Sequence, residues 1–362
     1  MIDLFQIKAQ LFIHDVVGIL IIYQSLVFLI FLIASAKAKP AFRYILELIY
    51  ATISCHFLYI LIENHFLTEP LMLGFFFGLT YGPLFFLYTL SLIVSELKIK
   101  TIISHFTLPT ISFLALIIIH SFSLSQWLIE ANVLLSIVVT VHISLYLIFS
   151  LLKIKSYKKQ LSNLRSSIDS ISLRWLSLII VLMLAAIFCA MLQSILVNII
   201  PMFDSLFISL TFVLVLTIVN CLYYLGLRQV SRFSGIPQEL SSGSRDGKFT
   251  MDSKEVEDLG LLLSKYMVKN EPYKEFELSL DDLAKAINLT SRKLSYVINS
   301  NFNLNFFEFV NGYRIEEAKR LLKNENLSIK EVMYDCGFSN KSTFNSFFKK
   351  LTGLTPSEFR KK

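Results

Sequence analysis

Charge and cysteine are scarce in this sequence. Charged residues make up 17% of the 362 residues, and cysteine occurs four times. The cysteines form no Cys-x-x-Cys pair and no cysteine–histidine spacing of the kind that holds a metal, so we expect no disulfide framework, no metal and no cofactor. The apolar segments also lack the HExxH and GxSxG motifs and any pair of aspartates. We therefore expect that the chain is not an enzyme.

The scarcity of charge is uneven along the chain. The first 227 residues contain 12 Lys+Arg and 9 Asp+Glu, whereas residues 228–362 contain 22 and 18. Hydrophobic residues reach 54% overall, above the roughly 45–50% of soluble domains. This division predicts an apolar domain over 1–227, a flexible linker rich in serine and glycine over 228–252, and a soluble domain over 253–362.

Seven apolar runs divide the first domain. Each is close to the roughly 20 helical residues that cross the hydrocarbon of a bilayer. The first run lacks a basic flank and a cleavage site of small residues, so we expect a retained span and not a signal peptide. The sequence predicts an all-α protein, with a seven-helix transmembrane bundle before a soluble helical domain. The runs are 16–36, 44–62, 71–95, 102–120, 131–152, 173–200 and 206–227.

The loops between these runs alternate in charge. The first, third and fifth loops carry lysine or arginine, and the second, fourth and sixth carry only acidic charges. Because basic loops stay in the cytoplasm, this pattern predicts a multi-pass inner-membrane protein with its N-terminus outside and its C-terminal domain inside. The basic fifth loop, 153–172, has two interpretations. It binds anionic lipid, which we favour, or it forms an arm that contacts the C-terminal domain.

Polar side chains inside the apolar runs are costly in lipid and should face the interior of the bundle. Those nearest the outer side are candidates for a sensor pocket for an unknown ligand or membrane partner. The alternative is that each forms a hydrogen bond between helices, worth about 1 kcal/mol. Glycines 74, 78 and 82 also predict a face of close helix packing. The candidate pocket residues are Gln24, His56, His142 and Gln193.

The soluble domain repeats a pattern of two short helices. The two copies lie near 278–299 and 327–350, and both begin with a capping box, Ser279 with Asp282 and Ser328 with Glu331. Each copy predicts a helix-turn-helix. In the second copy, Gly337 can adopt the left-handed conformation that ends the first helix.

The second helix of each copy has one apolar face and one polar face. Phe344, Phe347, Phe348 and Leu351 follow the spacing of a buried stripe. The opposite face is small, polar and cationic, as a helix in the major groove requires. The outward residues are Lys341, Ser342, Asn345, Ser346 and Lys349 in the second copy and Arg292, Ser295 and Tyr296 in the first.

These residues carry a resemblance to a known family. Residues 278–360 resemble the double helix-turn-helix domain of AraC/XylS-type transcriptional regulators, and the seven runs resemble its membrane-bound members in layout. The resemblance implies that the two second helices enter successive major grooves of double-stranded DNA. Many relatives have arginine where this chain has Tyr296 and Ser346, so a bidentate guanine contact is not implied there. The matching residues are Gly337-Phe338, Ser342, Phe344, Phe348, Lys349, Gly353, Thr355-Pro356 and Phe359-Arg360.

The sequence therefore predicts a membrane-anchored, one-component transcription regulator that binds promoter DNA, with a lipid bilayer and a second copy of the chain as further partners. Arg314, between the two copies, either contacts phosphate or has a structural role. The alternative function is a seven-span receptor or transporter whose cytoplasmic tail binds a protein.

Overall fold

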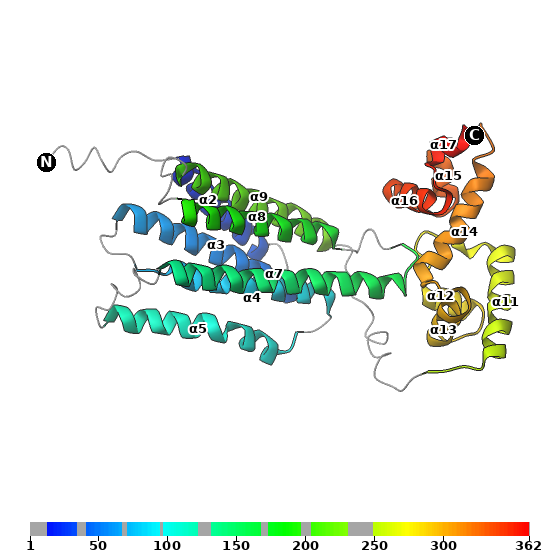
Figure 1. Cartoon of the computed structure of the whole chain (residues 1–362), viewed down its shortest axis with the longest axis horizontal. Coiled ribbons are helices and arrows are strands. Elements are labelled where there is room, and N and C mark those ends of the chain that lie inside the picture. The colour runs from blue at the N-terminus through cyan, green and yellow to red at the C-terminus, as the bar shows by residue number, and fades with distance from the viewer. Residues whose placement is uncertain are drawn as a thin grey trace. The chain divides into compact units, whose positions relative to one another are not determined.

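The computed structural model describes residues 13–34, 41–66, 71–94, 97–121, 132–167, 173–196, 204–230 and 249–361. Within these ranges the chain is all-α, and its only pairing of the β type is one isolated bridge (Figure 1). Most of the predicted linker lies outside them. The chain divides into two compact units. Unit 1 contains residues 1–154 and 173–236, and unit 2 contains residues 155–172 and 237–362.

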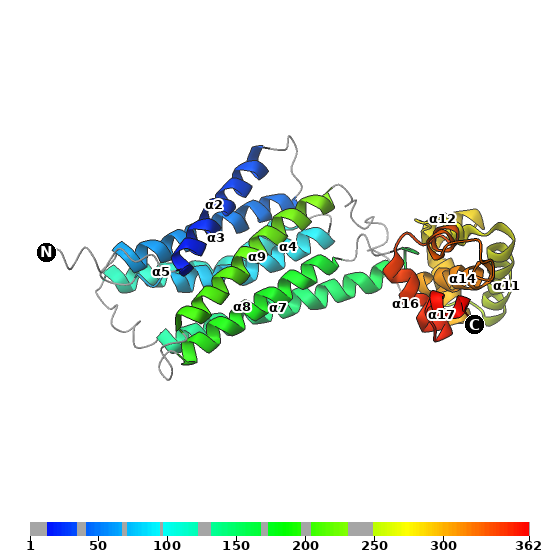
Figure 2. The same cartoon turned by 90° about the horizontal axis from the view of Figure 1, so that it is seen from above.

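Unit 1 is a bundle of apolar helices. Among the described residues, seven helices are long and apolar enough to cross a membrane, as judged by length and composition. Helix α2 packs against α3 and α9, α3 against α4, α4 against α5, and α8 against α9 (Figure 2). Their bounds are α2 Ile13–Ala34, α3 Ala41–Phe66, α4 Gly74–Ile93, α5 Ile99–Ser121, α7 Asn132–Ser162, α8 Arg174–Leu196 and α9 Asp204–Val230.

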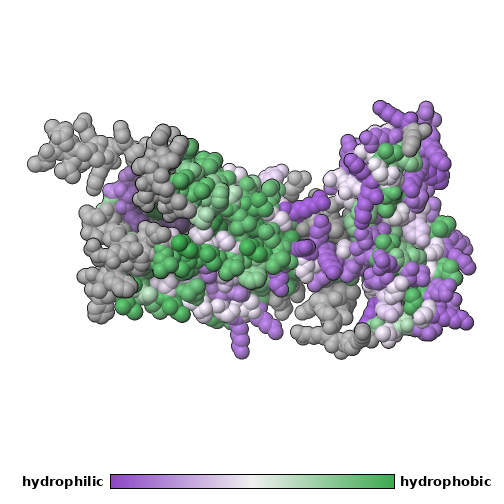
Figure 3. Space-filling model, in the orientation of Figure 1, coloured by the Kyte–Doolittle hydropathy of each residue, from purple (hydrophilic) through white to green (hydrophobic). Residues whose placement is uncertain are grey.

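Many large apolar side chains of unit 1 face outward, such as Ile30 and Leu134. Figure 3 shows this as a hydrophobic surface over the helices of unit 1, whereas the surface of unit 2 is mainly hydrophilic. Two of the three predicted glycine contacts are present. A Cβ atom on Gly78 would lie 2.5 Å from Val139 Cγ1, and one on Gly82 would lie 3.0 Å from Tyr146 Cδ2. Both glycines thus bring α4 close to α7, whereas Gly74 has open space around it.

Unit 2 begins with the end of α7 and continues with short, well-capped helices. The predicted boxes at Ser279 and Ser328 are present, and a third box joins Thr355 to Glu358. Asp252 and Glu255 have the spacing of a further capping box, but the Asp252 carboxylate accepts from the Lys254 amide, which makes a simple cap. The helices are α11 Ser253–Asn270, η2 Pro272–Lys274, α12 Leu280–Ala286, α13 Ser291–Phe302, α14 Phe306–Leu321, α15 Ile329–Asp335, α16 Lys341–Thr352 and α17 Pro356–Arg360.

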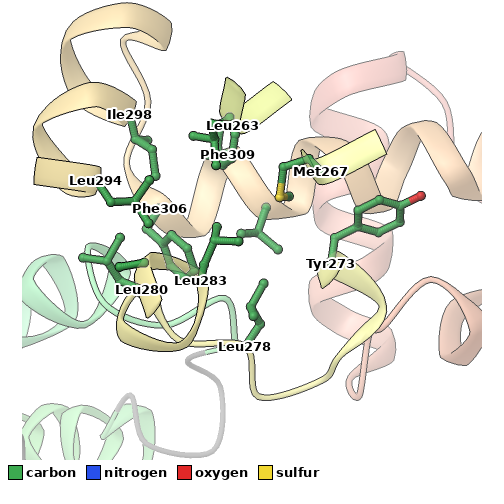
Figure 4. Close-up of a cluster of buried hydrophobic side chains, with 12 residues drawn as sticks. Leu263, Met267, Tyr273, Leu278, Leu280, Leu283, Leu294, Ile298, Phe306 and Phe309 are labelled. Atoms are coloured by element: carbon green, nitrogen blue, oxygen red, sulfur yellow. The ribbon is translucent and has the colours of Figure 1, made fainter. Parts of the chain in front are cut away.

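Unit 2 has two hydrophobic clusters, one for each helix pair. The first joins α11, α12, α13 and the start of α14 (Figure 4). The second joins the rest of α14 to α15 and α16. Phe344 and Phe348 are fully buried in the second cluster and Phe347 packs at its edge. Leu351, predicted to be buried with them, is 49% exposed, because α16 ends one residue later and this last turn extends past the cluster.

The segment 155–172 differs from its predicted place in the first domain. Residues 155–162 are the last part of α7, and the segment belongs to unit 2. Arg165 forms the antiparallel bridge with Ser279, at the start of α12. Of the two interpretations of this loop, the arm that contacts the C-terminal domain agrees with these contacts.

Candidate nucleic-acid interface

The second helix pair, α15 and α16, is joined by a tight turn. Gly337 has φ +82° and donates its N–H to the Tyr334 carbonyl, while Phe338 donates to the Met333 carbonyl and is buried. Asn340 then caps α16 by accepting from the amides of Ser342 and Thr343. These local bonds fix the direction of α16, as the sequence predicted from glycine in the left-handed region.

The outward face of α16 carries the predicted DNA-contacting residues. Lys341, Ser342, Ser346 and Lys349 are exposed, and Asn345 is half-buried. This face of α16 therefore carries a side-chain amide and hydroxyl groups beside lysines. Such groups can bond base edges and phosphates in a major groove.

Lys349 and Lys350 are neighbours in sequence but differ in surroundings. The ammonium of Lys350 donates to Glu308 Oε1 on α14 at 3.0 Å and lies 5.6 Å from the centroid of the Phe347 ring. Lys349 is exposed on the outward face. Lys350 therefore joins α16 to α14, and Lys349 is the better candidate for a phosphate contact.

The first helix pair, α12 and α13, has the same arrangement. Thr290 caps α13, and Leu294, Val297 and Ile298 are buried on its inner face. Arg292 is exposed on the outer face, and Ser295 is half-buried. Tyr296 also lies on this outer face and is half-buried, so α13 and α16 each present polar side chains opposite their buried face.

A residue before α11 covers part of this first surface. The Arg292 guanidinium lies 4.9 Å from the centroid of the Phe249 ring, and Tyr296 meets the same ring edge-on at 5.5 Å. Two of the three predicted DNA-contacting residues of α13 are thus engaged within the chain. No sequence pattern predicts this contact, because Phe249 lies in a stretch without helical periodicity.

Helix α14 connects the two pairs, and Arg314 lies at its centre. The Arg314 side chain is 1% exposed, so it has the structural role and not the phosphate contact. It donates to the carbonyls of Tyr273 at 2.7 Å and Glu275 at 2.6 Å, and it lies over the Phe338 ring. Burial lowers the pKa of its guanidinium to about 10, which leaves it charged at neutral pH. Arg314 thereby ties α14 to both hydrophobic clusters.

The four candidate residues of the sensor pocket contact different neighbours in unit 1. Gln24 accepts from Asn220 at 2.7 Å, joining α2 to α9, and His56 bonds the Tyr81 hydroxyl at 2.9 Å, joining α3 to α4. His142 stacks edge-on against Tyr146. Gln193 lies in α8 and is half-buried. Gln24 and His56 thus form bonds between helices, the alternative to a shared pocket.

Unit 1 also contains a buried polar group that no sequence pattern predicts. Asp15 is 4% exposed and lies 3.3 Å from His65 Nε2 and 3.8 Å from His14 Nε2. The two histidines are 51 residues apart, so no local spacing marks them. Within the described residues, no group of three His, Cys, Asp or Glu side chains has the geometry of a metal site.

Comparisons with known proteins agree with this geometry. Residues 283–362 match the family model described as "Helix-turn-helix domain". The chain is 36% identical over 84 residues to the uncharacterized HTH-type transcriptional regulator YijO of Escherichia coli, and also 36% identical over 84 residues to the Msm operon regulatory protein of Streptococcus mutans. The C-terminal region is an AraC-type helix-turn-helix domain.

Each of these similarities covers only part of the chain and of the relative. The two alignments cover 23% of this chain and 30% of each relative. The urease operon transcriptional activator of Escherichia coli is 30% identical over 95 residues, which is 26% of this chain and 31% of that protein. A solved structure also matches: the crystal structure of the C-terminal domain of the two-component response regulator yesN from Fusobacterium nucleatum. Its sequence is 28% identical and its TM-score is 0.26, and the match covers 28% of this chain and 98% of that chain.

Proposed function

We propose that this chain is a membrane-anchored transcription regulator that binds promoter DNA through both helix pairs of its AraC-type domain. The observation that carries the proposal is the duplicated recognition surface, in which α13 and α16 each bury one face and present polar side chains on the other. Seven apolar helices precede it. We assign them to a membrane anchor that also senses a signal, with the N-terminus outside and the AraC-type domain in the cytoplasm.

The side chains of the two surfaces suggest how DNA is read. Arg292 suits guanine, and Asn345 suits adenine, because each can form two hydrogen bonds to the major-groove edge of that base. Lys349 suits a phosphate, which adds affinity without sequence preference. Helix α14 spaces the two surfaces for successive major grooves, and a second copy of the chain would supply a second pair of half-sites.

The test uses the full-length chain in lipid nanodiscs and a pool of random DNA duplexes. Repeated selection should enrich one sequence, and binding should weaken steeply with salt. The double variant Lys341→Ala/Asn345→Ala should lose at least tenfold in affinity for that sequence. The matched control Lys269→Ala/Asn270→Ala changes the same two residue types on exposed positions of α11 and should bind normally.

Two results would contradict the proposal. Either no sequence is enriched, or the two double variants bind the enriched DNA equally. Each would favour the alternative, in which the C-terminal region of a seven-span receptor binds a protein.

A further inference from the structure

The segment that follows α7 forms backbone hydrogen bonds with the AraC-type domain. The Ser166 amide donates to the Leu278 carbonyl at 3.1 Å, and the Leu280 amide donates to the Leu164 carbonyl at 2.9 Å. Arg165 and Ser279 are the paired residues between these two bonds. Residues 164–166 therefore lie antiparallel to residues 278–280 over this one isolated bridge, where α12 begins.

Side-chain hydrogen bonds around the buried Ser166 add to these backbone bonds. Ser166 is 1% exposed, and its hydroxyl donates to the Leu278 carbonyl at 2.8 Å. The Arg314 guanidinium donates to the Ser166 hydroxyl and to its carbonyl, both at 3.1 Å. The side-chain Nδ2 of Asn311 donates to the same carbonyl at 3.2 Å. Ser166 thus supplies two of the acceptors around the buried charge of Arg314.

Apolar packing adds to these bonds. The side chain of Leu164 packs against the first hydrophobic cluster, the one that contains Leu280 and Leu294. The segment therefore contacts the domain through backbone, polar and apolar groups together.

The internal repeat offers a comparison within the molecule. Ser279 and Ser328 occupy the same position, each capping the first helix of its pair through a capping box. Ser279 is buried under residues 164–166, whereas Ser328 is exposed. A capping box therefore forms without burial of its serine, as at Ser328. The burial of Ser279 by residues 164–166 is a specific property of the first helix pair.

The contact lies close to the end of a long helix. Helix α7 ends at Ser162, and only two residues separate that end from Arg165. The three residue steps from Ser162 to Arg165 span at most about 11 Å, so little slack remains between the helix and the bridge. The other connection in the sequence, between α9 and α11, has many more residues, because α9 ends at Val230 and α11 begins at Ser253.

We propose that residues 164–166 are an intramolecular docking strand that couples α7 to the first helix pair of the AraC-type domain. The occupant of the docking site is this named segment of the chain itself. A displacement of α7 would pass through the strand to α12 and Arg314, and DNA binding at α13 would in turn affect the strand. The coupling rests on the proposed function, whereas the docking does not.

Docking is tested by a disulfide trap in the full-length chain. Paired residues of this type have Cα atoms about 4.5 Å apart, which is within the range for a disulfide. Arg165→Cys with Ser279→Cys should therefore cross-link rapidly on mild oxidation. The control is Arg165→Cys with Ser328→Cys, which places the second cysteine on the equivalent cap of the other pair.

The native thiols do not interfere if Cys55, Cys189 and Cys221 are first changed to alanine. Cys336 can stay, because it is fully buried and burial raises the pKa of its thiol to about 12. Cross-linking at least tenfold faster at Ser279→Cys than at Ser328→Cys would support docking. Equal rates would overturn it, because a freely moving domain would meet both positions alike.

Amide hydrogen exchange gives a second measurement that needs no change at a cap. The Leu280 amide should exchange slowly in the unmodified chain, and Ser166→Ala should accelerate its exchange at least tenfold. Ser162→Ala is the matched control, since its hydroxyl donates only within α7, to Lys159. An unprotected Leu280 amide in the unmodified chain would contradict docking.

Coupling is tested by adding the DNA duplex enriched with the full-length chain to the Arg165→Cys/Ser279→Cys variant. Because coupling between two events is reciprocal, bound DNA should change the cross-linking rate at least threefold, while a scrambled duplex should leave it unchanged. An unchanged rate with DNA bound would overturn coupling. If no duplex binds at all, the proposed function fails, while the trap still decides whether the strand docks.

Discussion

At the scale of single residues, the two recognition surfaces differ in how free their side chains are. The Phe249 ring contacts Arg292 and Tyr296 on α13, whereas the exposed groups of α16 face outward. The chemistry of both surfaces follows from helical spacing. The Phe249 contact does not, because it depends on where a non-helical segment lies in space.

Replacing Phe249 with alanine should strengthen DNA binding. The variant frees Arg292 from a cation–π contact worth about 0.5–1 kcal/mol at an exposed site, which corresponds to about two- to fivefold in affinity. The measurement is a titration of the full-length chain with its selected duplex. Weaker binding would instead mean that the ring holds Arg292 in the orientation that DNA requires.

The neighbouring lysines provide a second prediction. Lys349→Ala should weaken binding to all DNA sequences alike and reduce the slope of log affinity against log salt by about 1, because one phosphate contact is lost. Lys350→Ala should leave that slope unchanged, since its ammonium is engaged with Glu308. Salt titrations of both variants provide the check, and equal slopes would refute the assignment.

The surroundings of Glu317 predict how the stability of the AraC-type domain depends on pH. The Glu317 side chain is 7% exposed, and hydrogen bonds from Arg320 hold the pKa of its carboxyl below the usual value, with Lys274 adding to the effect. When the pKa of a carboxyl is lower in the folded state than in the unfolded state, its ionised form stabilises the fold at pH values above the unfolded-state pKa. This stabilisation is lost as the pH falls through the folded-state pKa. Glu317→Gln should therefore lower the melting temperature of the AraC-type domain at pH 7 but not near pH 3. An equal loss at both values would contradict the ion pair.

At the scale of elements, the helices of unit 2 were predicted well because their signals are local. A capping box needs four consecutive residues, so the starts of α12, α15 and α17 could be recognised from sequence. The docking strand could not. Ser166 has no helical or alternating pattern around it, and its partner Leu278 lies 112 residues away. Only the folded chain brings them together.

The turn between α15 and α16 gives a prediction at this scale. A Cβ atom on Gly337 would lie 2.5 Å from the Tyr273 carbonyl oxygen and 2.8 Å from that of Lys274. Gly337→Ala therefore adds a backbone clash to the strain of a positive φ. Gly353→Ala at φ +77° has open space and carries only the strain, about 1 kcal/mol. Thermal unfolding of the full-length chain should show a clearly larger loss for Gly337→Ala, and comparable losses would be inconsistent with the clash.

At the scale of the whole molecule, composition predicted the division between apolar helices and a charged helical domain. It did not predict that residues 155–172 would belong to the second unit. A division by hydropathy assigns a loop to the spans on either side of it. Hydropathy does not predict that a loop forms hydrogen bonds with a segment distant in the sequence.

The proposed topology predicts which ends of the chain are accessible from each side. A protease added to cells whose outer membrane has been removed should cleave off a tag placed before α2 but leave a tag after residue 362 intact. Opening the inner membrane should make the second tag sensitive. Protection of the first tag, or cleavage of the second before the inner membrane is opened, would refute an outside N-terminus with a cytoplasmic AraC-type domain.

The distance in sequence between Ser166 and Leu278 also sets an order of events during synthesis. The contact spans 112 residues, so its second half leaves the ribosome about 6–22 s after the first at 5–20 residues per second. Helices α8 and α9 are made in that interval. The strand therefore stays unpaired until Leu280 has been made, and its pairing can form only after α8 and α9 have been synthesised.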